Sequence, residues 1–164
     1  MSEHIIEVSE LQINVKKRHM TQALVKSVSF SVPKGSIMGV VGESGSGKSI
    51  VMKSLMNNLA QGLESDFNTY QFDGKPVNAK DKLPISMIFQ DPMTALNPVR
   101  TIGYHLVEII KRFQHIKGKK AKDLAIAELS KVGIDNPQAR FRQFPHELSG
   151  GMRQRVLIAM ALLA

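Results

Sequence analysis

The stretch 37–49 has the residue types and the spacing that bind a phosphate group. It reads IMGVVGESGSGKS and ends in a complete G-x-x-x-x-G-K-[ST] pattern. Glycines let such a backbone turn tightly, so that its N–H groups surround a phosphate without a Cβ in the way. Lys48 adds a positive charge for the β- and γ-phosphates, and Ser49 offers its hydroxyl to Mg²⁺. The expected phosphate ligands are Gly42, Glu43, Ser44, Gly45, Ser46, Gly47, Lys48 and Ser49. The stretch predicts a nucleoside-triphosphate site.

A strand and a helix must hold this loop. The apolar run 37–41 predicts a strand buried on both faces, as in a parallel sheet. Behind the loop, Val51, Leu55 and Leu59 recur at helical spacing, and Gly62 can end that helix. The helix would direct its positive N-terminus at the bound phosphate.

A second candidate site residue follows another short apolar run. Residues 85–89 predict a buried strand that delivers Gln90 at its end, and Pro92 and Pro98 bracket a loop that is not helical throughout. Ligands of open α/β sheets bind beyond the carboxyl ends of strands. We therefore expect Gln90 to reach the nucleotide or its metal, whereas the alternative is a solvated glutamine at a strand end.

The third candidate lies at 145–155, PHELSGGMRQR, which opens an apolar helix. The core stripe of that helix is expected at Met152, Val156, Ala159 or Met160, and Leu163. Ser149, Gly150 and Gly151 sit where the helix begins, so they present a second set of N–H groups to an anion.

The rest of the chain predicts strands followed by helices. Apolar residues alternate near period two in 5–15, which predicts a strand or hairpin with one wet face, and again in 28–32, which predicts a second half-buried strand. The segment 61–82 is polar, with a hairpin-like turn at Asp73-Gly74. An apolar stripe from Ile102 to Phe113 predicts a helix with Thr101 as its N-cap, and a second stripe, 121–132, ends at Gly133.

Composition excludes several classes of protein. With 164 residues and 43% apolar content the chain suits one domain, and without Cys it has neither disulfides nor thiolate metal sites. No apolar run approaches the ~20 residues of a membrane span, and the first residues lack the order of a signal peptide. We therefore expect a soluble chain in the cytoplasm.

The formal charge of +8 leaves a nucleic acid or an anionic membrane surface open as partners. Basic residues gather at 111–112 and 117–122, where a solvated helix end and loop is the simplest explanation. Aromatic residues are 5% of the chain and Trp is absent, so platforms for stacking bases are scarce. We expect no nucleic-acid partner.

Taken together, these segments resemble the ATPase subunits of ABC transporters. Leu148-Ser149-Gly150-Gly151, followed by Gln154, is similar to the signature motif of that family. GESGSGKS, FQDPMTALNP and FPHELSGGMRQRVLIAMAL resemble, more narrowly, the importers for oligopeptides, dipeptides and nickel. The sequence DGKPV at 73–77 weakly favours the nickel or metal-chelate branch of these importers.

The resemblance implies an α/β fold, namely a phosphate-loop NTPase core with an antiparallel β subdomain and an inserted helical subdomain. One ATPase domain would cover residues 1–164, incomplete at its C-terminus. Its parts would be the β subdomain and phosphate-loop core in 1–91, the helical subdomain at about 92–147, and the signature with its helix in 148–164.

The resemblance also implies how the parts work. Two ATPase subunits meet head to tail, and each ATP lies between one phosphate loop and the other subunit's signature. Ser149, Gly150 and Gly151 would then bind the γ-phosphate held by Lys48 of a second subunit, while Gln90 would sense Mg²⁺ and the attacking water. The implied partners are membrane permease subunits and, indirectly, a substrate-binding protein. The implied location is the cytoplasmic face of the cell membrane.

Two departures from the family pattern carry expectations. The family stacks an aromatic residue on adenine roughly where Arg18 or His19 stands here, so we expect weak stacking or stacking by His19. The acidic strand that holds the metal, the catalytic Glu and the switch His are not found up to Ala164. We therefore expect ATP hydrolysis from the full-length subunit and little or none from residues 1–164.

Two other functions compete with that of an importer motor. One is a soluble phosphate-loop ATPase that acts on nucleic acid, although such proteins usually carry long coiled-coil insertions or paired ATPase domains. The other is a non-catalytic, nucleotide-dependent interaction module. The transported substrate is not readable from this chain, because the permease and the binding protein select it.

Overall fold

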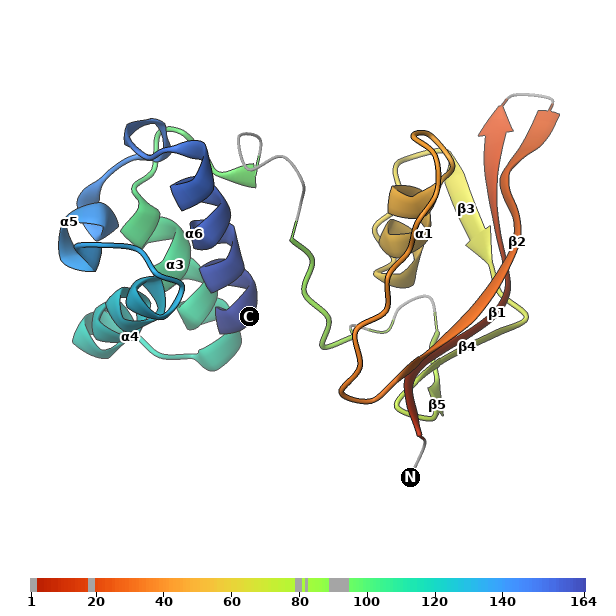
Figure 1. The fold of residues 1–164 in the computed structure, drawn as a ribbon, viewed down its shortest axis with the longest axis horizontal. Helices are drawn as coiled ribbons and strands as arrows, with labels where there is room; N and C mark the ends of the chain where they lie inside the picture. The colour runs from red at the N-terminus through yellow and green to blue at the C-terminus, as the bar shows by residue number, and fades with distance from the viewer. Residues whose placement is uncertain (1–2, 18–19, 79–80, 82, 89–94) are drawn as a thin grey trace. The chain divides into compact units, whose positions relative to one another are not determined.

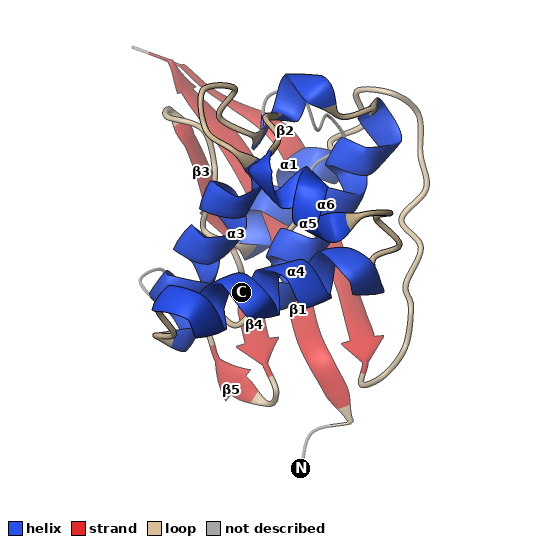
Figure 2. Cartoon of the chain, turned by 90° about the vertical axis from the view of Figure 1, so that its left-hand side faces the viewer, coloured by secondary structure: helices blue, strands red, loops and turns tan. Residues whose placement is uncertain are grey.

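The computed structural model describes residues 3–17, 20–78, 81, 83–88 and 95–164, and they form two compact units, 1–85 and 86–164. Every strand among these described residues belongs to the first unit, and the described part of the second unit is helical (Figures 1 and 2). Among the described residues, no helix is long and apolar enough to span a bilayer.

Unit 1 is an antiparallel sheet with one helix. Its strands are β1 (His4–Lys17), β2 (Met20–Pro33), β3 (Leu63–Asp66), β4 (Thr69–Phe72) and β5 (Lys75–Pro76). The order is β2-β1-β4-β5, and β3 also pairs with β1, so β1 is the strand on which the others assemble. Helix α1 (Lys48–Leu55) packs on this sheet. Their shared core consists of Val8, Leu11, Ile13, Val25, Val51, Leu55 and Tyr70.

A bulge in β1 explains why its apolar pattern changes phase. Val8 pairs with Phe30 and Leu11 with Val28, so the register shifts between them. Within the bulge Glu10 has a φ of 51°, and its N–H donates to the Ser29 hydroxyl at 2.9 Å. The extra residue keeps both Val8 and Leu11 on the buried face, although they are three positions apart.

One turn prediction is confirmed, and one helix is shorter than expected. Asp73 and Gly74 both have positive φ, 50° and 73°, in the turn that joins β4 to β5. Helix α1 ends at Leu55, with Asn57 at a φ of 51°, well before Gly62. Beyond this end, Leu59 still packs against the core of the sheet.

The two predicted buried strands, 37–41 and 85–89, are not strands in this structure. The backbone at 37–41 is loop, and the Ile37 and Val41 side chains are 101% and 93% exposed. Residues 85–88 are likewise without strand structure, and Phe89 lies outside the described residues. A parallel strand requires hydrogen-bonded neighbours, and every ladder among the described residues is antiparallel. Apolar character alone does not make a strand.

Unit 2 packs its helices around one apolar core. They are α3 (Ile102–Ile109), a π-helical turn (Ile110–Gln114), α4 (Gly118–Lys131), α5 (Pro137–Arg142), a 3₁₀ turn (Pro145–Glu147) and α6 (Gly150–Leu163). The fully buried side chains of this core include Ile102, Leu106, Ile110, Leu129 and Val156. Thr101 caps α3 as expected, because its side chain accepts from the Tyr104 N–H.

One residue of the predicted α3 stripe points outward. Phe113 is 53% exposed, whereas Ile110, three residues earlier, is fully buried. The π-helical turn is wider than an α-helical one, so it rotates Phe113 off the stripe that begins at Ile102.

Candidate nucleotide-binding site

The phosphate loop leads into helix α1, whose N-terminus has no side-chain cap. The N-cap of α1 is Gly47, at a φ of 94°, and no side chain caps the helix. A turn closes the loop, since the Ser46 N–H donates to the Glu43 carbonyl at 3.2 Å. Residues 42–46 and Ser49 are exposed, and Lys48 is half-buried. The first N–H groups of α1 are thus available to an anion.

The ammonium group of Lys48 holds the loop together. It donates to the carbonyls of Gly42 at 2.8 Å and Glu43 at 2.6 Å, and to the Ser46 hydroxyl at 3.3 Å. An ammonium has three donors, so this loop satisfies all of them. A phosphate bound within the loop would meet a positive charge that the backbone has already positioned.

Two glycines of the loop stand where a side chain would be crowded. A Cβ on Gly47 would lie 3.2 Å from Cγ2 of Val25, a buried residue of β2. A Cβ on Gly42 would lie 3.0 Å from the Ser46 hydroxyl. Gly47 also needs its left-handed φ, so both its conformation and its surroundings favour glycine.

The opposite end of α1 is anchored to the sheet by Tyr70. The Tyr70 hydroxyl donates to the Leu55 carbonyl at 2.7 Å, and the phenol ring stacks on Phe67 with centroids 5.0 Å apart. Burial raises the pKa of Tyr70 to about 12, because the phenolate would lose its hydration there. The end of the phosphate loop therefore lies against Val25, and the helix that follows it is anchored by Tyr70.

The metal ligands expected for this site are only partly described. Ser49 is exposed on the first turn of α1, where its hydroxyl is accessible. Gln90, together with Arg18 and His19, lies outside the described residues. The described residues contain no group of three or more His, Asp or Glu that could hold a metal ion. From this part of the chain, Ser49 is the residue that fits Mg²⁺.

The other predicted anion site is the start of α6. Ser149 is the N-cap, and its hydroxyl accepts from the Met152 N–H at 3.3 Å. Leu148 is buried, whereas Ser149, Gly150 and Gly151 are exposed. A Cβ at either glycine would meet nothing within 4 Å. Nothing within the described chain therefore explains two glycines in the first turn of a helix.

A turn and an arginine position that helix start. In the 3₁₀ turn before α6, the Glu147 carboxylate accepts from the Phe144 N–H at 2.7 Å. Arg155, in the second turn of α6, donates to the carbonyl of Gly133 at 2.6 Å and so ties α6 to the end of α4. No sequence pattern predicted the contacts of Arg155, Val25 or Tyr70, because their partners are backbone atoms and side chains distant in sequence.

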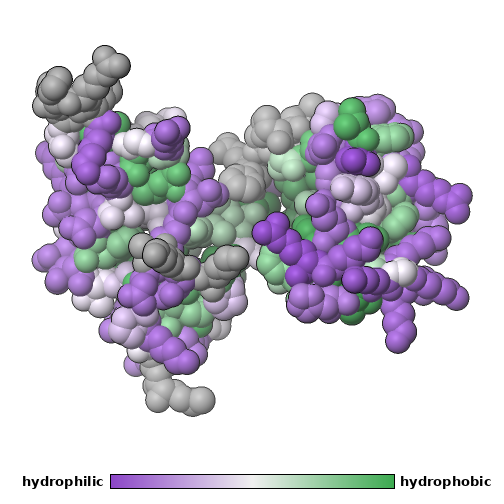
Figure 3. Space-filling model, turned by 180° about the vertical axis from the view of Figure 1, so that it is seen from behind, coloured by the Kyte–Doolittle hydropathy of each residue, from purple (hydrophilic) through white to green (hydrophobic). Residues whose placement is uncertain are grey.

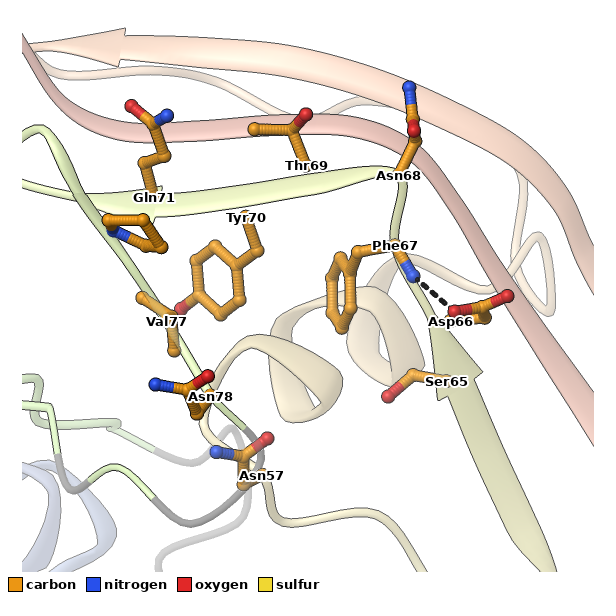
Figure 4. A pocket seen from close by; sticks show the side chains of 11 residues that line it. Asn57, Ser65, Asp66, Phe67, Asn68, Thr69, Tyr70, Gln71, Val77 and Asn78 are labelled. Atoms are coloured by element: carbon orange, nitrogen blue, oxygen red, sulfur yellow. Dashed lines mark hydrogen bonds between the residues drawn. The ribbon is translucent and has the colours of Figure 1, made fainter.

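A cavity of about 410 Å³ lies at the far end of α1 from the phosphate loop. Its walls include Asn57, Phe67, Asn68, Tyr70 and Asn78 (Figure 4). The described residues that line it include no lysine or arginine, so this lining lacks the charge that a phosphate site requires. None of the predicted site residues that the structure describes belongs to it.

The family model described as ABC transporter matches residues 25–164. The chain belongs to the ABC transporter family. It is 40% identical over 170 residues to the oligopeptide transport ATP-binding protein OppD of Bacillus subtilis, a match that covers 98% of this chain and 47% of that protein. It is 37% identical over 166 residues to the dipeptide transport ATP-binding protein DppD of Haemophilus influenzae, covering 96% of this chain and 50% of that protein. The chain thus spans about half the length of these relatives.

Solved structures support the same fold. The structure of cbiO1 from Clostridium perfringens, part of the ABC transporter complex cbiONQ, matches with a TM-score of 0.74 at 22% identity, covering 99% of this chain and 62% of that one. A dimeric ATP-binding cassette in a post-hydrolysis state, bound to ADP and Pi, matches with a TM-score of 0.78 at 21% identity, covering 96% and 69%. The predicted fold class, a phosphate-loop ABC ATPase core of α/β type, is confirmed.

Proposed function

We propose that this chain binds ATP with Mg²⁺ and is the ATP-binding part of an importer for peptides. The observation that carries the proposal is the loop from Gly42 to Ser49, which brings an uncapped helix start and the Lys48 ammonium to one place. Such a loop is built for the β- and γ-phosphates of a nucleotide. Units 1 and 2 would together form one ATPase domain.

The roles of the residues follow from their chemistry. The backbone N–H groups from Glu43 to Lys48 surround the phosphates, and Lys48 offsets their charge. Ser49 supplies an oxygen to Mg²⁺, and Gln90 contacts the metal and the attacking water. The metal supplies the Lewis acidity that hydrolysis requires when it is bound.

The start of α6 would serve a second copy of the ATPase subunit. We infer that Ser149, Gly150 and Gly151 bind the γ-phosphate held by Lys48 of that copy. Two bare glycines with open space around them support this inference, because an incoming phosphate needs the room that a side chain would fill. The remaining proposed partners are membrane permease subunits, at the cytoplasmic face of the membrane, and a substrate-binding protein that acts through them.

The names of the relatives favour peptides as the transported substrate. Both OppD and DppD are peptide transport ATP-binding proteins, and each matches nearly the whole chain. Nickel or a metal chelate is the alternative, and it rests only on the wording of residues 73–77.

A nucleotide titration tests the proposal. Lys48→Ala removes a charge-assisted contact to phosphate, which typically contributes about 1.5–3 kcal/mol, so ATP affinity should fall tenfold or more. Lys53→Ala is the matched control, because Lys53 lies on the same helix in its last turn. Binding is measured by calorimetry with ATP and Mg²⁺. Equal affinities for the two variants would remove Lys48 from the site and contradict the proposed function.

A further inference from the structure

A run of the chain in unit 2 carries positive charge without any negative charge. Between Glu108 and Asp123 there is no Asp or Glu. The same run contains Lys111, Arg112, Lys117, Lys119, Lys120 and Lys122, which are all exposed. None of these side chains forms an ion pair with a carboxylate in the described part of the chain, whereas Lys16, Lys34 and Lys131 each do. We call residues 111–122 the basic edge.

An aromatic ring projects from this basic edge into solvent. Phe113 is 53% exposed, and the Arg112 guanidinium lies 5.7 Å from its ring centroid. The backbone beneath the ring is fixed on both sides. Ile110 is fully buried, and the Gln114 amide donates to the Leu163 carbonyl at 2.8 Å. The ring is therefore presented outward by a firmly held π-helical turn.

Several lysines of the basic edge lie at the N-terminus of α4, where a positive charge destabilises the helix. Lys117 is the N-cap of α4 and caps nothing with its side chain, and the first turn of α4 contains no acidic residue. Lys119 and Lys120 occupy that first turn, next to the positive end of the helix dipole. Residues that break a local rule without an internal gain mark a functional surface. An anionic partner would supply the missing compensation.

The basic edge is continuous in space as well as in sequence. In Figure 1 the segment from the end of α3 to the start of α4 runs along the lower border of unit 2. Hydrophilic side chains gather over that part of the unit in the view from behind (Figure 3). The charge of the chain is concentrated here, since residues 86–164 hold twelve Lys and Arg against six Asp and Glu.

We propose that the basic edge is a docking surface for an anionic phospholipid membrane, with Phe113 inserted among the headgroups. Clusters of four to eight Lys and Arg beside a membrane bind anionic lipid, and an exposed apolar ring adds burial at the interface. A nucleic acid fits less well, because five of the six Lys and Arg side chains are Lys and the phenyl ring of Phe113 has no hydrogen-bonding group to read a base. The inference goes beyond the proposed function and rests on none of its steps.

Vesicle sedimentation with the full chain tests the inference. The probes are vesicles of phosphatidylcholine alone and vesicles of phosphatidylcholine mixed with phosphatidylglycerol. We expect binding to the mixed vesicles only, and weaker binding at high salt because salt screens the attraction. Lys119→Gln with Lys120→Gln should lower the partition tenfold or more, and Phe113→Ser should lower it several-fold.

The control removes the same charge elsewhere. Lys26→Gln with Lys75→Gln changes two exposed lysines of unit 1 and should leave the partition unchanged. Circular dichroism checks that each variant is folded. Equal binding to neutral vesicles, no binding to either kind, or an equal loss in the control would overturn the inference. Duplex DNA is the competing ligand. If DNA displaced the unchanged chain from the vesicles and did not bind the Lys119→Gln, Lys120→Gln variant, the basic edge would be a nucleic-acid site. That result would also overturn the inference.

Discussion

Helices α1 and α6 begin in different ways, although both were predicted to face phosphate. The start of α1 has no side-chain cap, and the Lys48 ammonium is drawn back into the loop before it by two carbonyls. The start of α6 is capped by the Ser149 hydroxyl, and two exposed glycines follow. The start of α1 has both a cation, Lys48, and a loop whose backbone N–H groups can surround a phosphate. The start of α6 offers N–H groups and open space, and it depends on something else to bring the anion.

The two helices are alike at their other ends. The last turn of α1 is held by the Tyr70 hydroxyl on the Leu55 carbonyl, and that of α6 by the Gln114 amide on the Leu163 carbonyl. In both cases a side chain from another element satisfies a carbonyl that has no partner within the helix. The helices are therefore anchored in the same way and differ at their starts, where we propose that phosphate binds.

The largest effect is expected from Ser149→Arg. If the start of α6 receives a nucleotide held by a second copy, a large cation at the N-cap blocks that approach. Binding of ATP to the unpaired chain should remain intact, because Lys48 and its loop are untouched. Sedimentation velocity with ATP and Mg²⁺ measures pairing, and calorimetry measures binding. A variant that pairs normally would end the proposal that α6 acts in trans.

The next effect concerns the hydrogen bonds that hold the C-terminal ends of α1 and α6, and it depends on pH. Tyr70 has a raised pKa of about 12 in the folded chain, against about 10 when unfolded, so its neutral form stabilises the fold below pH 10. As pH rises from 10 to 12 the unfolded state releases this proton first, and the free energy of unfolding falls by roughly 2–3 kcal/mol. The amide of Gln114 has no such transition.

Urea unfolding from pH 9 to pH 12 measures this loss. The Tyr70→Phe variant should be about 1 kcal/mol less stable at neutral pH, because the Leu55 carbonyl loses its donor, and it should lack the alkaline loss that Tyr70 causes. Tyr104→Phe, at an exposed tyrosine of α3, is the control and should behave as the unchanged chain does. An identical alkaline loss in Tyr70→Phe would show that this anchor is not the sensitive group.

A third effect tests the geometry before α1. Gly47→Ala places a side chain at a φ of 94° and brings its Cβ to 3.2 Å from Val25, so unfolding free energy should fall by about 1–2 kcal/mol. Gly39→Ala is the control, because its φ is not positive and a Cβ there meets nothing within 4 Å. Urea unfolding compares the two. A loss as large for Gly39 as for Gly47 would show that the loop, rather than this one glycine, is sensitive.

Much of this arrangement was readable from the sequence, and the reason is that it is local. The caps at Thr101 and Ser149, the turn at Asp73-Gly74 and the end of α4 before Gly133 each depend on a few neighbouring residues. Their side chains and backbone angles act within one or two turns. The fold class came from the resemblance of short motifs, such as 42–49 and 148–154, to those of one family.

The features that escaped prediction depend on residues distant in sequence. The segment 37–41 is apolar, but a strand needs hydrogen-bonded neighbouring strands, and an apolar run does not predict whether they are present. Strands β3 and β4 were not predicted in the polar segment 61–82, because they form by pairing with β1. Phe113 fitted a helical stripe, and a π-helical turn removed it from that stripe. The contact of Val25 with Gly47 joins residues that only the folded sheet brings together.

The smallest effect separates folding from function at the start of α6. Gly151→Ala adds a methyl group that meets nothing within 4 Å, and alanine favours a helix over glycine by up to about 1 kcal/mol. The variant should therefore be a few tenths of a kcal/mol more stable and yet pair less readily in the presence of ATP and Mg²⁺, because the methyl occupies the space left for the phosphate. Gly47→Ala at the other helix should show the opposite sign in stability. Urea unfolding and sedimentation velocity give both quantities on the same samples. If Gly151→Ala gained stability and paired as well as the unchanged chain, the glycine would not be reserved for an anion, and the difference between the two helix starts would need another explanation.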